Sequence, residues 1–331
     1  KSADRINGRS IRQGGVQEVD IVSLVRPVTK FAKTITNPLD IGPAIDTALY
    51  QMRSGRPGPV WLDIPLDIQG VQLPKDYFSH WSPPKPTPTP APNIQKICDL
   101  IEGARRPIIL VGHGVRLAGA DQKLRSLLEK LGIPAVFTWN ALDLLPYDHP
   151  LNIGRPGVVA ARAPNFAVQN SDLLISIGAR LDNIVTAYNP SGFARAAKKI
   201  VVDIDAGELK EHKEMNIDYP LQMDALDFIN LLLSLPVNSG SESWRERCSD
   251  WKRRFGVSSV SPKSESRTIS HAAFIHSFSK AAPENTLIAA GSSGLAIEFF
   301  FSKFKNKQGQ RTFLTSGLGA MGYGLPAAIG A

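Results

Sequence analysis

The hydrophobic positions between about residue 93 and residue 235 follow two alternating patterns. Apolar residues recurring every three or four positions predict helices, and short apolar runs between glycine or proline predict buried strands. The predicted helices are Ile94–Glu102, Asp121–Leu131 and Phe166–Asn170, and the predicted strands are Pro107–Gly112, Pro134–Phe137, Leu173–Ile177 and Lys199–Ile204. Alternation of this kind indicates an α/β domain with a parallel sheet covered on both faces. Such sheets bind ligands at the carboxyl ends of their strands.

A shorter α/β pattern precedes this block, in residues 1–75. It contains an apolar run at Val19–Val25, a helix-like stretch at Pro38–Arg53 and a strand-like segment at Pro59–Ile64. Six prolines then occur within the ten residues Pro83–Pro92. Because proline cannot continue a helix or a central strand, we expect residues 76–92 to form an extended, semi-rigid linker.

The α/β pattern returns near Thr268, after a polar segment (residues 236–267) that holds one predicted helix with Trp244 and Trp251. The elements predicted there are a helix at His271–Ala282, a strand at Thr286–Ala290, a turn at Gly291–Gly294, a helical run at Leu295–Phe301 and a strand at Arg311–Leu314. Residues 316–331 follow, with four glycines in eight positions and then a small apolar run. This order predicts a loop whose backbone can approach a ligand, followed by a tightly packed helix. Because the chain stops within that apolar run, we expect it to be part of a longer protein.

Composition limits the classes of function. The net charge of +8 is spread along the chain, and the densest basic cluster, Arg245–Arg254, alternates with acidic residues and tryptophan. That pattern favours a solvated helix face over a phosphate-binding stripe, so we do not expect nucleic-acid binding. Cys98 and Cys248 are the only cysteines, which suits a reducing, cytoplasmic setting. No apolar run approaches the roughly 20 residues needed to span a bilayer, so we expect no membrane partner.

The turn Gly291–Gly294 is the first candidate for chemistry. It follows a predicted strand and precedes a helical run, and it offers backbone amides and the hydroxyls of Ser292 and Ser293. Those groups suit a phosphate. An ordinary strand-to-helix turn would have the same composition, and both interpretations stay open on this motif alone.

Four stretches together carry a family resemblance: Gln17–Val22 with Arg26–Lys30, Ser54–Pro65, Ala167–Asp172 with Gly178–Asp182, and Gly317–Ala331. In order and spacing they resemble the thiamine-diphosphate (ThDP) enzyme superfamily, in its acetolactate synthase-like branch. The resemblance implies three successive α/β domains, the first and third incomplete here. These are the end of a pyrimidine-binding domain (1–75), a central domain (93–235) and the start of a diphosphate-binding domain (268–331).

The resemblance also implies a ThDP site. Gly291, Ser292 and Ser293 match the turn that contacts the diphosphate. Gly319 matches the residue whose carbonyl accepts from the aminopyrimidine, Ala320 lies next to it, and Met321 matches the apolar residue that holds the cofactor bent. A bend of this kind supports proton removal within the cofactor. The alternative for Met321 is an ordinary core methionine.

Two further residues match catalytic positions of the family. Gln17 matches a glutamine near the cofactor, although Val16 stands where the family has phenylalanine. Lys30 matches a position near the substrate entrance, and its alternative is a solvated surface lysine.

Many members of the family bind FAD, which the resemblance implies as a second cofactor. The positions that match its contacts are Arg26, Gly112, His113, Gly114, Gly178, Arg180, Asp182, Asp203 and Asp205. Strand-end glycines can admit a pyrophosphate, and carboxylates can accept from ribose or adenine. However, the charged run after Arg180 becomes Asp182-Asn183-Ile184 here, and the glycines could also be simple turns.

The function implied is ThDP- and Mg²⁺-dependent decarboxylation of a 2-oxo acid, followed by ligation of the resulting enamine to an acceptor carbonyl. The partners implied are small 2-oxo acids or aldehydes and further copies of the chain, at least as a homodimer. The family's activating glutamate and its Mg²⁺ ligands match no residue here, so we expect the chain alone to be inactive. Two alternatives remain. One is another ThDP-dependent lyase or transferase acting on aldehydes or sugars, and the other is a non-catalytic nucleotide-binding α/β module.

Overall fold

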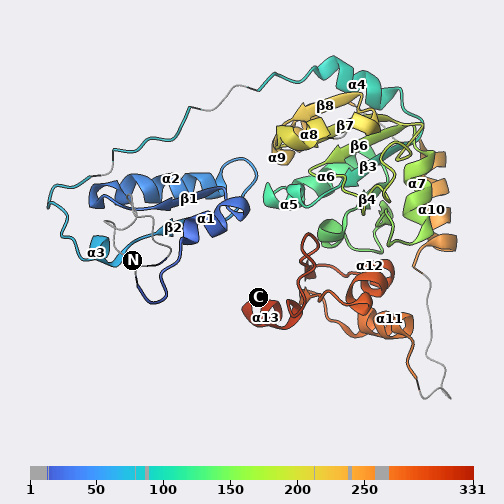
Figure 1. The fold of residues 1–331 in the computed structure, drawn as a ribbon. Coiled ribbons are helices and arrows are strands. Elements are labelled where there is room, and N and C mark those ends of the chain that lie inside the picture. The colour runs from blue at the N-terminus through green and yellow to red at the C-terminus, as the bar shows by residue number, and fades with distance from the viewer. Residues whose placement is uncertain are drawn as a thin grey trace. The chain divides into compact units, whose positions relative to one another are not determined.

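The computed structural model describes residues 13, 15–78, 80–85, 89–211, 213–237, 241–257 and 268–331 (Figure 1). The chain divides into two compact units, Lys1–Pro88 and Thr89–Ala331. The division falls inside the proline-rich segment, of which residues 86–88 lie outside the described part. The further division of the second unit into a central and a diphosphate-binding domain stays a prediction.

The first unit is a small α/β arrangement. Its elements are α1 (Ile21–Val25), η2 (Arg26–Val28), β1 (Phe31–Thr34), η3 (Pro38–Asp40), α2 (Ile41–Arg53), β2 (Val60–Asp63) and α3 (Leu66–Gln69). Strands β1 and β2 pair in parallel, with Phe31 opposite Val60. The predicted helix and strand are confirmed as α2 and β2. Strand β1 was not predicted, because Phe-Ala-Lys-Thr contains a single large apolar residue.

The second unit is built on a six-stranded parallel sheet with the order β5-β4-β3-β6-β7-β8. The strands are β3 (Pro107–Val111), β4 (Ala135–Phe137), β5 (Asn152–Gly154), β6 (Leu173–Ile177), β7 (Lys198–Asp203) and β8 (Tyr219–Gln222). From β3 the chain first builds outward through β4 and β5, and it then returns to the other side of β3 for β6, β7 and β8. The order therefore reverses between β3 and β6, and such a switch point is where open parallel sheets bind ligands.

Helices cover both faces of this sheet, as Figure 1 shows. They are α4 (Ile94–Glu102), α5 (Gly114–Leu117), α6 (Asp121–Leu131), α7 (Arg162–Asn170), α8 (Ala206–Glu211), α9 (Ala225–Ser234) and α10 (Glu242–Phe255), with the 3-10 turns η4 (Trp139–Leu144) and η5 (Lys213–Met215). Ile109 and Val111 of β3 pack into one core cluster with α4, α6 and α9. The intervening Ile108 and Leu110 pack into a second cluster with α7 and α10. Burial on both faces explains why β3 and β6 read as continuous apolar runs.

The predicted α/β class and parallel sheet are confirmed, and every helix and strand predicted in residues 93–235 is present. The elements that escaped prediction are the helices α5, α8 and α9, the 3-10 turns η4 and η5, and the strands β5 and β8. The two strands are only three and four residues long and contain polar residues, so neither shows a clear period. The basic cluster lies on α10, with Trp244 and Cys248 buried and Arg253 and Arg254 paired with Asp250, as the solvated-face interpretation predicts.

The C-terminal part of the second unit begins with α11 (His271–Ala281) and ends with α13 (Gly324–Gly330). Between them lie β9 (Leu287–Ala289), a π-helical turn η6 (Leu295–Phe299), α12 (Phe300–Lys303) and β10 (Arg311–Phe313). Strands β9 and β10 pair in parallel. A third, aromatic-rich core cluster joins this part to the sheet, because Leu142 of η4 packs with Phe300, Phe301 and Phe304.

Candidate cofactor site

Two glycine-containing segments predicted to hold ThDP meet in the structure. The Ser292 hydroxyl donates to the carbonyl of Ala320 over 2.6 Å. The backbones of Gly291 and Gly324 also lie close, since a Cβ added at Gly324 would come within 3.3 Å of the Gly291 Cα. The turn after β9 and the glycine-rich loop after β10 thus form one surface of the second unit.

This surface is open rather than packed. Met321 and Leu318 are 96% and 92% exposed. A Cβ added at Gly317, Gly319 or Gly322 would meet nothing within 4 Å. Gly319 and Gly322 have φ angles of +59° and +81°, which favour glycine for conformational reasons. The interpretation of Met321 as a core methionine is therefore wrong.

The Gly291–Gly294 turn also begins a helix. The Ser293 side chain accepts from the Ala296 amide at 3.3 Å, and its carbonyl accepts from the Ile297 amide at 2.9 Å. The turn therefore has the hydrogen bonds of an ordinary strand-to-helix turn and also contacts the glycine-rich loop. Ser293 acts in an ordinary helix start, whereas Ser292 links the turn to the glycine-rich loop.

The glycines predicted to contact FAD lie at the switch point of the large sheet. Gly112 follows β3 and Gly178 follows β6, and the Gly114 amide donates to the Gly178 carbonyl at 3.0 Å. A Cβ added at Gly112 would lie 2.0 Å from that same carbonyl oxygen. Contact between two backbone segments is enough to require these glycines. Their presence is therefore not, by itself, evidence for a pyrophosphate.

The charged FAD candidates of the second unit occupy the same edge. Asp203, at the end of β7, is buried and accepts from the Asp205 amide, and Asp205 accepts from the Gly207 amide. Asp182 accepts from the amides of Ile184 and Val185. Arg180, 61% exposed, pairs with Glu208 at 3.2 Å. The carboxylates thus stabilise turns at the edge, and Arg180 extends into solvent.

Gln17, Arg26 and Lys30 belong to the first unit. Gln17 is exposed and has a left-handed φ of +63°, and Arg26 is exposed in η2. The Lys30 ammonium donates to the carbonyls of Ser54 and Arg56, at 2.5 and 2.9 Å. Lys30 therefore holds the turn after α2, a contact that neither predicted role anticipated.

Residues 94–232 match the family model described as thiamine pyrophosphate enzyme, central domain. These residues form a thiamine pyrophosphate enzyme central domain. Thiamine pyrophosphate is another name for ThDP, and the matched range contains the whole six-stranded sheet.

Curated relatives extend the similarity beyond the central domain. The chain is 36% identical to the acetolactate synthase large subunit of Corynebacterium glutamicum over 328 residues, covering 95% of this chain and 51% of the relative. It is 32% identical to the acetolactate synthase isozyme 1 large subunit of Escherichia coli and 33% identical to a probable acetolactate synthase large subunit of Methanocaldococcus jannaschii, covering in both cases 95% of this chain and 55% of the relative. The chain spans about half the length of these relatives.

A polar bridge connects the central domain to the open loop. His113 lies between Gly112 and Gly114, and its Nδ1 donates to the carbonyl of Asn140 in η4 at 2.9 Å. The Asn140 side chain donates to the Ser316 hydroxyl at 3.1 Å. Burial, aided by the nearby Arg311 and Arg116, holds the pKa of His113 below 6.5, although the contact with Asn140 opposes the shift. The ring is therefore neutral near pH 7, with the proton on Nδ1.

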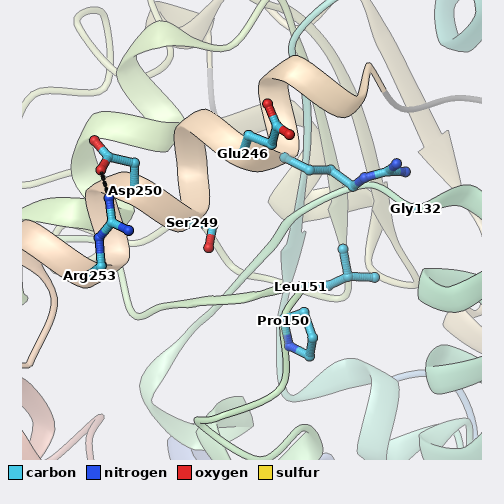
Figure 2. A pocket seen from close by; sticks show the side chains of 8 residues that line it. Gly132, Pro150, Leu151, Glu246, Ser249, Asp250 and Arg253 are labelled. Carbon is cyan, nitrogen blue, oxygen red and sulfur yellow. Dashed lines mark hydrogen bonds and ion pairs between the residues drawn. The ribbon is translucent and has the colours of Figure 1, made fainter.

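A hollow of about 710 Å³ lies elsewhere in the second unit, between α10 and the segments after α6 and before β5 (Figure 2). Its lining residues are Gly132, Pro150, Leu151, Arg245, Glu246, Ser249, Asp250 and Arg253. It contains none of the predicted site residues, and its Asp250 and Arg253 pair with each other. No group of three or more metal-binding side chains occurs in the described ranges. None of the helices in those ranges combines the length and the apolar character that a membrane span requires.

Proposed function

We propose that this chain carries part of the cofactor site of a ThDP-dependent enzyme of the acetolactate synthase type. The reaction would remove CO₂ from a 2-oxo acid and join the remaining carbon unit to a second carbonyl compound. The observation that supports this best is the Ser292–Ala320 contact, because it unites the two segments that match opposite ends of the cofactor.

The residues present fit ThDP. Gly317, Gly319 and Gly322 leave open space at the backbone, so a flat heterocycle could approach without a steric clash. Leu318 and Met321 offer apolar side chains that this unit leaves exposed. The Gly291–Ser293 backbone would hold the diphosphate, while Gly319 and Met321 would orient the pyrimidine. When bound, ThDP supplies a carbon nucleophile and accepts the electron pair left by CO₂.

The chain's own residues would position this chemistry. The hydrogen bond from Ser292 fixes the turn relative to the glycine-rich loop. The apolar side chains of Leu318 and Met321 would exclude water from the reacting carbon. We assign no Mg²⁺ ligand within the described residues. A homodimer or larger assembly and small 2-oxo acid substrates are part of the proposal.

FAD remains a secondary proposal for the edge at Gly112, Gly178 and Asp203. Gly112 and Gly178 lie at the switch point between β3 and β6, and Asp203 ends the neighbouring strand β7. Parallel sheets bind nucleotides at such a point. The visible absorption spectrum of the purified protein tests it, because bound flavin is yellow. A colourless protein that stays colourless after incubation with FAD would contradict it.

A comparison of ligand affinities tests the main proposal. The chain is titrated with ThDP plus Mg²⁺, and separately with ATP, ADP and thiamine. We expect ThDP to bind most tightly, because only ThDP presents both a diphosphate and the aminopyrimidine. Preference for ATP or ADP would favour the nucleotide-binding module, and absence of ThDP binding would overturn the proposed site.

The matched variants Gly319→Ala and Gly119→Ala locate the binding. Both glycines have positive φ, +59° and +66°, and a Cβ added at either would meet open space. The two substitutions should therefore cost similar stability. Only Gly319→Ala should weaken ThDP binding, and equal effects of the two variants would place the cofactor elsewhere.

A further inference from the structure

Asp143 is a buried carboxylate that no family motif pointed to. It lies in η4 of the central domain, and its side chain is 1% exposed. One oxygen accepts from Arg116 at 2.8 Å. The other accepts from the Arg311 guanidinium at 2.9 Å and from the Thr312 amide at 2.7 Å.

These partners come from two different parts of the second unit. Arg116 belongs to α5, which begins at Gly114 beside the switch point. Arg311 and Thr312 belong to β10, the strand that leads into the glycine-rich loop. Asn140, from the same turn as Asp143, donates to Ser316 in that loop. The turn η4 therefore holds both the strand and the start of the loop.

The electrostatics make Asp143 hard to replace. Two guanidinium groups, each only 22% exposed at the side chain, converge on one carboxylate. Without its negative charge they would repel each other in a partly buried setting, and the Thr312 amide would lose its acceptor. The loop beyond has little packing of its own, since Leu318 and Met321 extend into solvent. Besides the contacts of Ser316 with Asn140 and of Ala320 with Ser292, its position depends on how β10 is anchored.

We propose that Asp143 is a positioning residue for the cofactor loop. It fixes β10, and through it residues 315–321, against the carboxyl edge of the central sheet. The inference rests on the proposed function only for what the loop binds, because the anchoring itself requires no ligand.

Hydrogen exchange on the ligand-free chain tests the anchoring. In Asp143→Asn we expect the hydrogen-bonded amides of this segment, Thr312 and Gly319, to exchange about tenfold faster, while the amides of β3 and β6 keep their protection. Asp121→Asn is the matched control. Asp121 pairs with the same Arg116, at 2.7 Å, but is 41% exposed and belongs to α6. It should leave the loop unchanged.

Asp143→Glu separates positioning by charge from simple packing. Glutamate keeps the charge and both acceptor oxygens, whereas asparagine keeps the shape and one acceptor oxygen but loses the charge and replaces the other oxygen by an NH2 donor. If charge positions the loop, glutamate restores part of the protection and asparagine does not. If Asp143 merely fills space, asparagine resembles the wild type and glutamate is worse, which would overturn the proposal.

Arg311→Met serves as a second variant in case Asp143→Asn does not fold. It removes only the contact made from β10, and it should speed loop exchange several-fold with β3 and β6 unaffected. Equal acceleration in β3 and β6 would mean general unfolding and would contradict the proposal. A wild-type chain that fails to bind ThDP would overturn the proposed function and leave this inference standing.

Discussion

Two glycine-rich edges of the second unit look alike in sequence and differ in structure. At the switch point of the large sheet, Gly112, Gly114 and Gly178 press backbone against backbone, and a Cβ at Gly112 would lie 2.0 Å from a carbonyl oxygen. In the C-terminal loop, a Cβ at Gly317, Gly319 or Gly322 would touch nothing within 4 Å.

The difference distinguishes two reasons why a position requires glycine, close packing of the backbone and access for a ligand. At the switch point, chain packing alone accounts for the residue, so the glycines say little about a ligand. In the loop, packing accounts for none of them, and φ accounts for Gly319 and Gly322 but not for Gly317, which has no positive φ. An open, apolar, glycine-rich surface is what a bound cofactor would cover.

The largest expected effect is at the packed edge. Gly112→Ala should lower the free energy of unfolding by more than about 3 kcal/mol, because the added Cβ would meet the Gly178–Ala179 backbone, which cannot move aside as a flexible side chain could. Chemical denaturation measures it, with Gly317→Ala as the control that should stay within about 0.5 kcal/mol of wild type. If both variants lost the same free energy of unfolding, the proposed difference between the packed edge and the open loop would be wrong.

The attachment of the C-terminal part should show the next largest effect. Arg155 is buried and donates to the carbonyls of Phe301 and Phe304, at 2.6 and 2.7 Å, and burial lowers its pKa to about 10. Arg155→Met would leave both carbonyls without this donor, at a cost of about 2 kcal/mol. Exchange should rise first in α12 and β10. If β3 and β6 lose protection equally, the two parts fold as one cooperative unit.

A smaller effect is expected for the open loop. Gly319→Ala and Gly119→Ala should each cost about 1 kcal/mol, because alanine is strained at positive φ. Thermal unfolding checks the equality. A clearly larger loss for Gly319→Ala would mean that the loop is packed after all.

The smallest expected effect is a dependence of the folding stability on pH. Burial lowers the pKa of His113 below 6.5, and the pKa values of His149 and His276 shift the same way, also chiefly through burial. Because the folded pKa lies below the unfolded one, this stability is complete above pH 6.5 and is lost as the pH falls through the folded pKa. The unfolding midpoint should therefore drop in mild acid. His113→Gln should reduce that slope, and an unchanged slope would remove His113 as a contributor.

Much of the fold was predictable because its signals are local. Helix α6 and strand β6 were predicted at their observed bounds, since period and length identify a core helix and a core strand. Strands β5 and β8 were missed because each is short and contains polar residues, whereas the equally short β4 is a continuous apolar run. That the loop binds a ligand stays a prediction. Its exposure was not predicted, because the sequence alone left open that Met321 is a core residue.

The amino-acid sequence by itself determined the α/β class, the family of the central domain and the position of the glycine-rich segments. The tertiary structure alone decided which glycines serve packing and which face open space. It alone brought Ser292 to Ala320, 28 residues away, and Thr312 to Asp143, 169 residues away. The physical reason is that hydrophobic period and turn chemistry act over neighbouring residues. A buried carboxylate instead acquires its role from charges that meet only when distant segments pack together.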